Sequence, residues 1–332
     1  MSETRTEPKI ITVTLNPSLD RTLVTHFLAL GYHNWTRETT RLDIAGRAIS
    51  VSRALYALGV PTHAAVLIGH DAIGQAYQAL LAEEQFPISI LRREGLTRST
   101  IIIKDTGHQN ETHIFEDSSG LNPPDLQAVS DLLQELIHPG DTVVFAGSLP
   151  GDTPADTYAG LTDMAQSAGA QVAINAGGGD SLKESLKAGP DFVYLTQLQA
   201  EGLFNFPVRV PEDVLHCAQL LREKGAGTVL ITMLQSQRAI LVPDESVWMA
   251  EWPDVAVGTH SGMEEAMIAG CLAGLYRQQP LDETLKLSAA AAAYTGLQVG
   301  HEFGTAKDIS EQANGIAVMQ VRDVSELHAL NV

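Results

Sequence analysis

The stretch Thr259-His260-Ser261-Gly262-Met263-Glu264-Glu265 leads directly into the run Ala266-Met267-Ile268-Ala269-Gly270-Cys271-Leu272-Ala273-Gly274-Leu275-Tyr276. The run carries no charged residue, which is typical of a helix that is buried on all sides. At about 11 residues it is far too short to span a membrane, which takes about 20 residues. We therefore expect a core helix over Met263–Tyr276.

The turn that precedes this helix combines two opposing features. A glycine turn at a helix N-terminus offers free backbone N–H groups and the positive end of the helix dipole, which together favour an anion. The same turn carries the adjacent carboxylates of Glu264 and Glu265. Ser261-Gly262-Met263-Glu264 also fits the capping box S-x-x-E, in which Glu264 folds back onto the N–H of Ser261. The sequence thus predicts either a structural cap or an altered anion site.

Composition narrows the class of protein. The 332 residues carry a formal net charge of −19, which disfavours a nucleic-acid-binding surface, and a hydrophobic content of 44% supports a sizeable core. Residues 1–8 are polar and lack the apolar core of a signal peptide, so we expect neither secretion nor a membrane anchor. Cys217 and Cys271 lie far apart in expected helices and are predicted to be packing residues, as in a reducing cytoplasm.

Short β-type runs alternate with helical patterns along most of the chain, which indicates βαβ units and a parallel sheet covered on both faces. The expected strands are Ile10–Leu15, Ala64–Ile68, Thr142–Ala146, Val172–Asn175, Phe192–Leu195 and Val229–Thr232. The expected helices are Ile49–Leu58, Ile73–Glu84, Leu126–Ile137, Ala155–Ala168, Glu212–Lys224, Met263–Tyr276 and Asp282–Tyr294.

Two regions interrupt this alternation. Residues 22–43 lack helix signals, and Ser99–Phe115 is typical of a β-hairpin that turns near Asp105-Thr106-Gly107. We expect a small β-rich lid, formed by about residues 22–43 and 97–117, on a single α/β domain that spans residues 1–332.

Several segments, in this order, resemble the PfkB (ribokinase-like) carbohydrate kinases, and in particular the branch of 1-phosphofructokinase and tagatose-6-phosphate kinase. They are Thr14-Leu15-Asn16-Pro17-Ser18-Leu19-Asp20, Ala45-Gly46-Arg47-Ala48-Ile49-Ser50-Val51, Thr97-Arg98-Ser99-Thr100, Gly147-Ser148-Leu149-Pro150 and Ser261–Gly270. The resemblance implies a three-layer α/β/α sandwich with a mostly parallel central sheet and the β-rich lid. It also implies phosphoryl transfer from ATP, with Mg²⁺, to a hydroxyl of a phosphosugar such as fructose 1-phosphate or tagatose 6-phosphate.

The catalytic turn of that family, G-A-G-D, corresponds to Gly262-Met263-Glu264-Glu265. Glu265 therefore occupies the position of the catalytic base, with an arm longer by one methylene group. Glu264 replaces a glycine of the anion-binding turn. A carboxylate about 4 Å from a phosphate charge opposes it by roughly 4 kcal/mol at an effective dielectric constant near 20.

The resemblance places nucleotide binding at Gln197, Gln235 and Gln237, where the family's K-P-N-x-x-E and G-A-D-G segments have changed. Glycines are lost where a backbone has to approach a nucleotide closely. The family's D-T-S-G corresponds to the segment that begins at Asn175, within a residue of register.

The motifs that the resemblance assigns to substrate binding have changed less than those that it assigns to the nucleotide. The resemblance assigns substrate binding to Asp20, Arg47, Ser50, Arg98 and Ser148. Asp20 would contact sugar hydroxyls, and Arg47 and Arg98 would hold the phosphate. Arg47 replaces a family lysine and Ser50 replaces an asparagine; an arginine keeps the charge but can bind a phosphate with two parallel hydrogen bonds.

Because the changes converge on the nucleotide and the transferred phosphate, the sequence predicts weak or lost phosphotransfer with a phosphosugar ligand retained. Two alternatives stay open: a fully active, divergent kinase that uses Glu265 as base, with MgATP as donor, and a regulatory or scaffold pseudokinase that needs no cofactor. The resemblance further implies a cytoplasmic homodimer that pairs through the β-lid and binds neither nucleic acid nor membrane.

Overall fold

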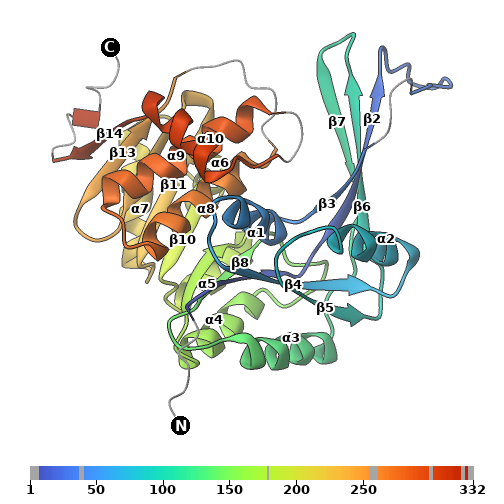
Figure 1. Ribbon diagram of the computed structural model, residues 1–332, viewed down its shortest axis with the longest axis horizontal. Coiled ribbons are helices and arrows are strands. Elements are labelled where there is room, and N and C mark those ends of the chain that lie inside the picture. Colours follow the sequence, from blue (N-terminus) through green and yellow to red (C-terminus); the bar gives the residue numbers. More distant parts are fainter. Residues whose placement is uncertain are drawn as a thin grey trace.

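Two β-sheets organise the chain in the computed structural model (Figure 1), which describes residues 7–36, 41–177, 179–253, 261–298, 302–322 and 326–327. The larger sheet has ten strands, and those from β5 to β11 along it run parallel. The strand order is β14 (Ala317–Val321), β13 (Val247–Glu251), β12 (Arg238–Val242), β11 (Thr228–Met233), β10 (Phe192–Thr196), β9 (Gln171–Asn175), β8 (Thr142–Ala146), β1 (Ile10–Thr14), β4 (Thr62–Gly69) and β5 (Ile88–Arg93).

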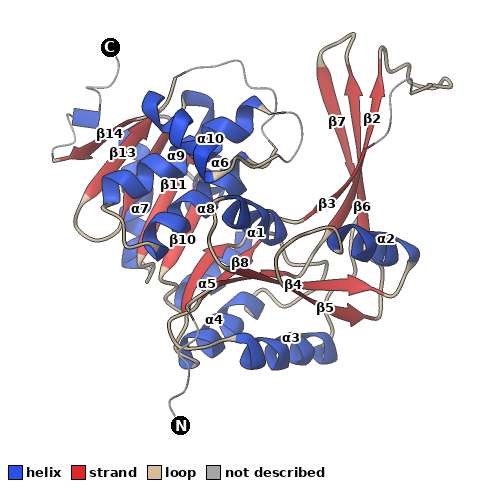
Figure 2. Ribbon diagram, in the orientation of Figure 1, coloured by secondary structure: helices blue, strands red, loops and turns tan. Residues whose placement is uncertain are grey.

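Helices cover both faces of this sheet, so the expected α/β/α layering is confirmed (Figure 2). One face packs against α3 (Pro123–Leu136), α4 (Thr157–Ser167), α5 (Gly179–Lys187), α6 (Gln197–Phe204) and α7 (Pro211–Glu223). The other packs against α1 (Arg47–Ala57), α8 (Met263–Tyr276), α9 (Leu281–Leu297) and α10 (Ala306–Gln312), and α2 (Ala72–Leu81) joins a smaller cluster near β4. The central strands are apolar throughout because both of their faces are buried.

The smaller sheet projects from the main body and has the order β3 (Arg41–Ala45), β2 (Ser18–Thr25), β6 (Arg98–Asp105) and β7 (Asn110–Phe115) (Figure 1). The hairpin between β6 and β7 lies where the sequence predicts it. The sheet begins at Ser18, four residues before the predicted start of the lid at Thr22, because the chain passes directly from the turn after β1 into β2. We call these four strands the lid.

Helix α8 is the core helix that the sequence predicts, with the same bounds. Its residues from Ala266 to Ala273 are buried, and it packs closely against α9. A Cβ atom on Gly270 would lie 2.7 Å from Ser288 Cα, and one on Gly274 would lie 2.6 Å from Thr284 Oγ1. Larger residues at these two positions would therefore separate the helices.

The predicted capping box at Ser261 is wrong in register. The N-cap of α8 is Gly262, in a left-handed conformation with φ of 85°, and no side chain caps the helix. Glu264 is instead directed to Arg47, whose Nη1 lies 2.5 Å from Glu264 Oε2. An ion-pair partner within reach has replaced the local cap. His260, which also flanks the turn, lies outside the described residues.

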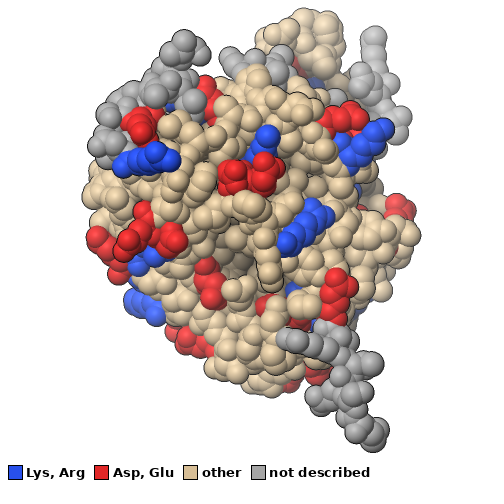
Figure 3. Space-filling model, turned by 60° about the vertical axis from the view of Figure 1, so that its left-hand side comes forward, with Lys and Arg blue, Asp and Glu red and all other residues tan. Residues whose placement is uncertain are grey.

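Several elements were not predicted. Strands β5, β12, β13 and β14 and helices α5, α6 and α10 are short, and three of the strands form an antiparallel extension of the sheet. The two cysteines are free and buried in α7 and α8, as predicted. Among the described residues, no helix combines the length and the apolar character needed to cross a bilayer. On the face shown in Figure 3, Lys and Arg side chains are scattered among acidic ones.

Candidate functional site

The predicted substrate residues meet at the carboxyl edge of the parallel strands. Ligands of open α/β sheets bind at this edge, because loops and helix N-termini converge there. A small polar cavity of about 70 Å³ lies at this place. Its lining consists of Thr14, Asn16, Gly46, Arg47, Arg98, Ala146, Gly147 and Ser148. Three of the five predicted substrate residues are therefore brought together.

Arg47, the first residue of α1, is the centre of the site's hydrogen bonding. Its Nη1 donates to Asn175 Oδ1 at 2.9 Å, at the end of β9, and to Glu264 Oε2 at 2.5 Å, in the first turn of α8. Asn175 is buried, and its amide nitrogen donates to the carbonyl of Tyr194 on β10. Arg47, Asn175 and Glu264 thus form one connected network.

Burial and charge act against each other in this network. Burial raises the pKa of Glu264; Arg47 opposes that rise, and the neighbouring Glu265 adds to it. Burial lowers the pKa of Arg47, but Glu264 and Glu265 together raise it above its ordinary value. The arginine therefore stays charged, and its charge is already balanced within the protein.

Arg98 and Asp20 approach the cavity from the base of the lid. In the register of β2 and β6, Ser18 lies beside Arg98 and Asp20 lies beside Thr100, so these residues share one face of the lid. The Oγ of Ser18 donates to Asp20 Oδ1 at 2.7 Å. Burial lowers the pKa of Arg98, and the Asp20 carboxylate opposes this. Arg98 Nε is buried and has no hydrogen-bond partner among the described residues, and Arg98 itself lines the cavity.

Asn16 is a site residue that the sequence assignment missed, although it lies inside the quoted T-L-N-P segment. Its amide nitrogen donates to Ser148 Oγ at 3.3 Å, and its amide oxygen accepts from Ser118 Oγ at 2.9 Å. Asn16 therefore orients Ser148 at the cavity. Ser50, in contrast, is buried in α1 and does not line the cavity.

The turn before α8 supplies the other side of the site. Gly262 adopts the left-handed conformation that a tight turn onto a helix requires. Met263 is buried, and its Sδ would lie 2.9 Å from a Cβ on Gly296 of α9, which anchors the turn to the core. Glu265 is half-buried beside Glu264, close enough to contribute to the pKa of both Glu264 and Arg47.

The predicted nucleotide residues follow β10 and β11 on the same edge of the sheet. Gln197 begins α6, and its amide donates to the carbonyl of Val208. Gln235 lies in a short 3-10 turn, and Gln237 ends that turn in a left-handed conformation with φ of 51°. The Gln237 amide donates to the carbonyl of Gln235 at 3.2 Å. The side chain of Gln237 is thus held against its own turn.

The N-terminus of α6 is also satisfied internally. Thr196 Oγ1 accepts from the N–H of Gln199 at 3.2 Å, and Gln199 Oε1 accepts from the N–H of Thr196 at 2.9 Å. Such a capping box uses backbone donors that could otherwise meet an anion. Within the described part of the chain, no cluster of three or more His, Cys, Asp or Glu residues is arranged to hold a metal ion.

The sequence matches the family model described as pfkB family carbohydrate kinase over residues 14–307. It is 28% identical to the 1-phosphofructokinase of Bacillus subtilis over 302 residues, which are 91% of this chain and 96% of the relative. It is also 28% identical to the 1-phosphofructokinase of Escherichia coli strain K12, over 86% of this chain and 90% of the relative.

Solved structures show the same fold. Phosphofructokinase-2 from Escherichia coli in complex with potassium has a TM-score of 0.86 and 24% identity, over 92% of this chain and 98% of that one. A possible 1-phosphofructokinase from Thermotoga maritima has a TM-score of 0.82 and 20% identity, over 95% of this chain and all of that one. At these identities the likeness concerns the fold.

Proposed function

The chain belongs to the PfkB family of carbohydrate kinases, and from this we propose that it binds a phosphosugar at the carboxyl edge of its sheet and transfers a phosphoryl group to it weakly or not at all. The proposal assigns ligand binding to Arg98, Ser148, Asn16 and Asp20. Glu265 occupies the position of the base. Fructose 1-phosphate, fructose 6-phosphate and tagatose 6-phosphate are the ligands to test first.

One observation carries this proposal: the contact between Arg47 Nη1 and Glu264 Oε2 at 2.5 Å. Phosphoryl transfer depends on fixed positive charge aimed at the oxygens of the moving phosphate. Here Glu264 brings a negative charge to the turn and also engages the arginine that would meet the phosphate. A transferred phosphate would have to separate this pair and approach a carboxylate.

The fit of ATP and Mg²⁺ to these residues is poor. Gln235 and Arg238 stand where the resemblance places the two glycines of G-A-D-G, the first turn of α6 is capped by its own residues, and Glu264 adds a carboxylate to the anion turn. When bound, MgATP would supply the phosphoryl group. This chain's own residues favour binding of the sugar phosphate over MgATP, because the positive charge that remains for a ligand is that of Arg98.

The test is an ADP-release assay with MgATP and each of the three sugar phosphates. We expect turnover of the unmodified chain to lie orders of magnitude below that of the double variant Glu264→Gly with Glu265→Asp. Calorimetry should give micromolar binding of a sugar phosphate, lost in Arg98→Met, and no micromolar binding of MgATP. Tight MgATP binding with rapid turnover of the unmodified chain would overturn the proposal and favour the divergent active kinase.

A second candidate is a phosphosugar-binding regulatory or scaffold protein without catalysis. The internally satisfied N-terminus of α6 favours it, because that helix end does not need a nucleotide. The double variant distinguishes the weak kinase from the binding protein. Restored turnover indicates a recently weakened kinase, whereas an inert double variant that still binds sugar phosphate indicates a binding protein.

We also propose that the chain forms a homodimer through the lid. Leu42, Arg21, Ile101 and Ile114 lie side by side across the four strands, and the apolar members of this row are 36 to 50% exposed. Contiguous apolar side chains on a sheet face favour association. Light scattering should give twice the chain mass for the unmodified protein and the monomer mass for Ile101→Lys with Ile114→Lys. A monomeric unmodified protein would refute the assembly.

A further inference from the structure

A hollow outside the candidate site lies at the opposite, amino edge of the sheet. It has a volume of about 540 Å³ and is bordered by the first residues of β8, β9, β10 and β11 and by the last turn of α8. Small-molecule pockets commonly measure about 300–1,000 Å³. We call it the amino-edge cavity. It shares no residue with the cavity around Arg47.

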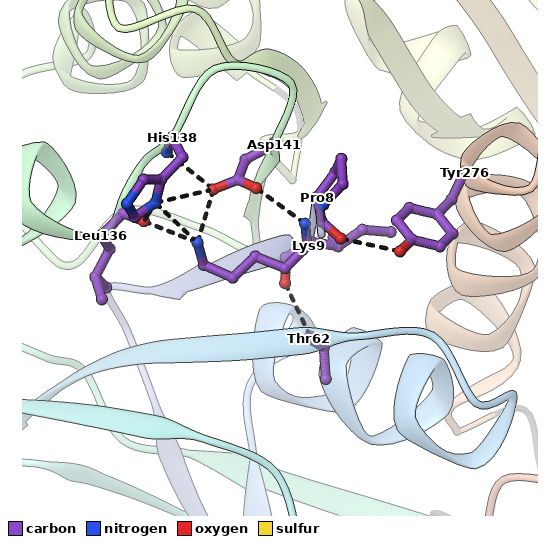
Figure 4. Close-up of polar contacts among 8 residues, drawn as sticks. Pro8, Lys9, Thr62, Leu136, His138, Asp141 and Tyr276 are labelled. Atoms are coloured by element: carbon purple, nitrogen blue, oxygen red, sulfur yellow. Dashed lines mark hydrogen bonds and ion pairs between the residues drawn. The ribbon is translucent and has the colours of Figure 1, made fainter. Parts of the chain in front are cut away.

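The wall of this cavity is fixed by hydrogen bonds (Figure 4). Tyr276, near the end of α8, donates its hydroxyl to the carbonyl of Pro8 at 2.9 Å and to Glu7 Oε1 at 3.2 Å. The following residue, Lys9, is held by Asp141, which accepts from the Lys9 N–H at 2.9 Å and from Lys9 Nζ at 2.8 Å. The segment that separates the cavity from its surroundings is therefore anchored on both sides.

The charge inside the cavity has one sign. Among the residues that line it, the carboxyl groups are Glu7 and Asp191, and none is Lys, Arg or His. Two cationic residues adjoin the lining in sequence and are engaged elsewhere: Lys9 Nζ with Asp141 and the carbonyl of Leu136, and Arg277 with the carbonyl of Leu58. In a chain with a net charge of −19, these carboxylates favour a cation.

The rest of the lining decides what kind of cation fits. Val172, Phe192, Leu272 and Leu275 provide apolar surface, and amide and hydroxyl groups lie between them. A bare metal ion requires several ligands converging on one point, and the described residues contain no group of three or more His, Cys, Asp or Glu side chains arranged to provide them. Apolar walls with two carboxylates instead suit a carbon skeleton that carries ammonium groups.

We propose that the amino-edge cavity is a binding site for a small organic cation, a short alkyl chain with one or two ammonium groups. Glu7 and Asp191 pair with the ammonium groups, and the apolar residues cover the chain. Tyr276 stays uncharged, because burial raises the pKa of its phenol, and serves as a hydrogen-bonding wall. The site goes beyond the proposed sugar-phosphate function and does not depend on it.

Calorimetry on the full chain with 1,4-diaminobutane tests the proposal, with n-butylamine and 1,4-butanediol as matched probes. We expect saturable binding of one diamine per chain, weaker binding of the monoamine, and no binding of the neutral diol. Equal binding of the diol would show that the cavity recognises a neutral polyol and would overturn the proposal, as would the absence of saturable diamine binding.

Two variants locate the site. Gln278→Arg places a positive charge on the cavity rim and should weaken diamine binding at least about tenfold, whereas Gln279→Arg, at the next residue outside the lining, should leave it unchanged. Glu7→Gln should weaken binding about fivefold, with Glu135→Gln on the exposed side of α3 as its control. Equal effects of each variant and its control would assign binding to the general acidic surface. Because Glu7 is on a terminal segment, its variant remains informative if Gln278→Arg fails to fold.

Discussion

The two edges of the central sheet present opposite electrostatic situations at the two ends of α8. At the carboxyl edge, Arg47 and Glu264 are already bonded to each other in a cavity of about 70 Å³. At the amino edge, Glu7 and Asp191 line a cavity of about 540 Å³ that contains no cationic side chain in its lining. An anion entering the first site competes with an internal partner, whereas a cation entering the second meets unbalanced charge. The fold alone therefore does not decide which edge of the sheet binds a charged ligand more tightly.

The largest expected effect concerns the carboxyl edge. Glu264→Gly removes a carboxylate from the anion turn and frees Arg47, so sugar-phosphate turnover should rise about 10²- to 10³-fold, or become measurable where it was absent. A coupled ADP-release assay measures it.

Glu264→Gln is the control that keeps the bulk and removes the charge, and it should give part of the gain. Glu265→Gln in the Glu264→Gly background should abolish turnover again. If neither change at Glu264 alters the rate, the ion pair does not limit transfer.

At the amino edge, Asp141→Ala should lower the free energy of unfolding by about 3 kcal/mol, because it leaves a buried lysine contact and two backbone N–H groups without their acceptor. Urea denaturation measures this. Glu311→Ala, which removes an exposed partner of Lys307, should cost less than about 0.5 kcal/mol. Similar losses of unfolding free energy in both variants would show that the anchored segment around Lys9 contributes little to stability.

The ion pair at the carboxyl edge should make stability depend on pH. Burial holds the pKa of Glu264 above its unfolded value, so the folded chain binds this proton more tightly and loses stability as pH rises through the interval between the two values. Arg47→Met removes the opposing charge and widens that interval. Relative to the unmodified chain, the variant should lose about 1 to 2 kcal/mol by pH 8 and less at pH 5.

Urea denaturation at both pH values measures this difference. Adding Glu264→Gln to Arg47→Met should remove the extra dependence on pH. A loss that is the same at pH 5 and pH 8 would mean that Arg47 acts through packing alone.

The smallest expected effect compares two glutamines in left-handed conformation, Gln237 near the carboxyl edge and Gln278 at the amino edge, with φ of 51° and 54°. Glycine adopts this conformation without strain, so Gln237→Gly and Gln278→Gly should each stabilise the chain by about 1 kcal/mol. Gln279→Gly, where φ is not positive, should destabilise it slightly. A loss of stability in either of the first two variants would indicate that its side chain makes a contact worth more than the strain.

Much of the main sheet was predictable because buried parallel strands and all-apolar helices leave strong patterns. Helix α8 is the clearest case: its charge-free run ends with the helix at Tyr276, and the glycine turn at Gly262 marks its start. Strands β12 and β13 were missed because they follow β11 through short connections, with no crossover helix to mark them. Strand β14 was missed although helices precede it. The start of the lid at Ser18 was missed because β2 follows β1 after three residues.

The site was predictable as a set of residues but not as a network. The motifs indicate that Arg47, Arg98 and Ser148 belong together, and they line one cavity. Nothing local indicates that Glu264 pairs with a residue 217 positions earlier in the chain, since a capping box at Ser261 is an equally good local solution. The amino-edge cavity left no local pattern either, because its lining comes from many separate segments.

The glycines of α8 bear on how this protein can change over time. Gly270 and Gly274 let α8 lie directly on the backbone of α9, so the helix axis is set by the core and not by the turn that precedes it. The side chains of Glu264 and Glu265 can therefore be exchanged, and a charge gained or lost, while the polypeptide at that corner keeps its course. The geometry of this corner is therefore separable from the charge that it carries.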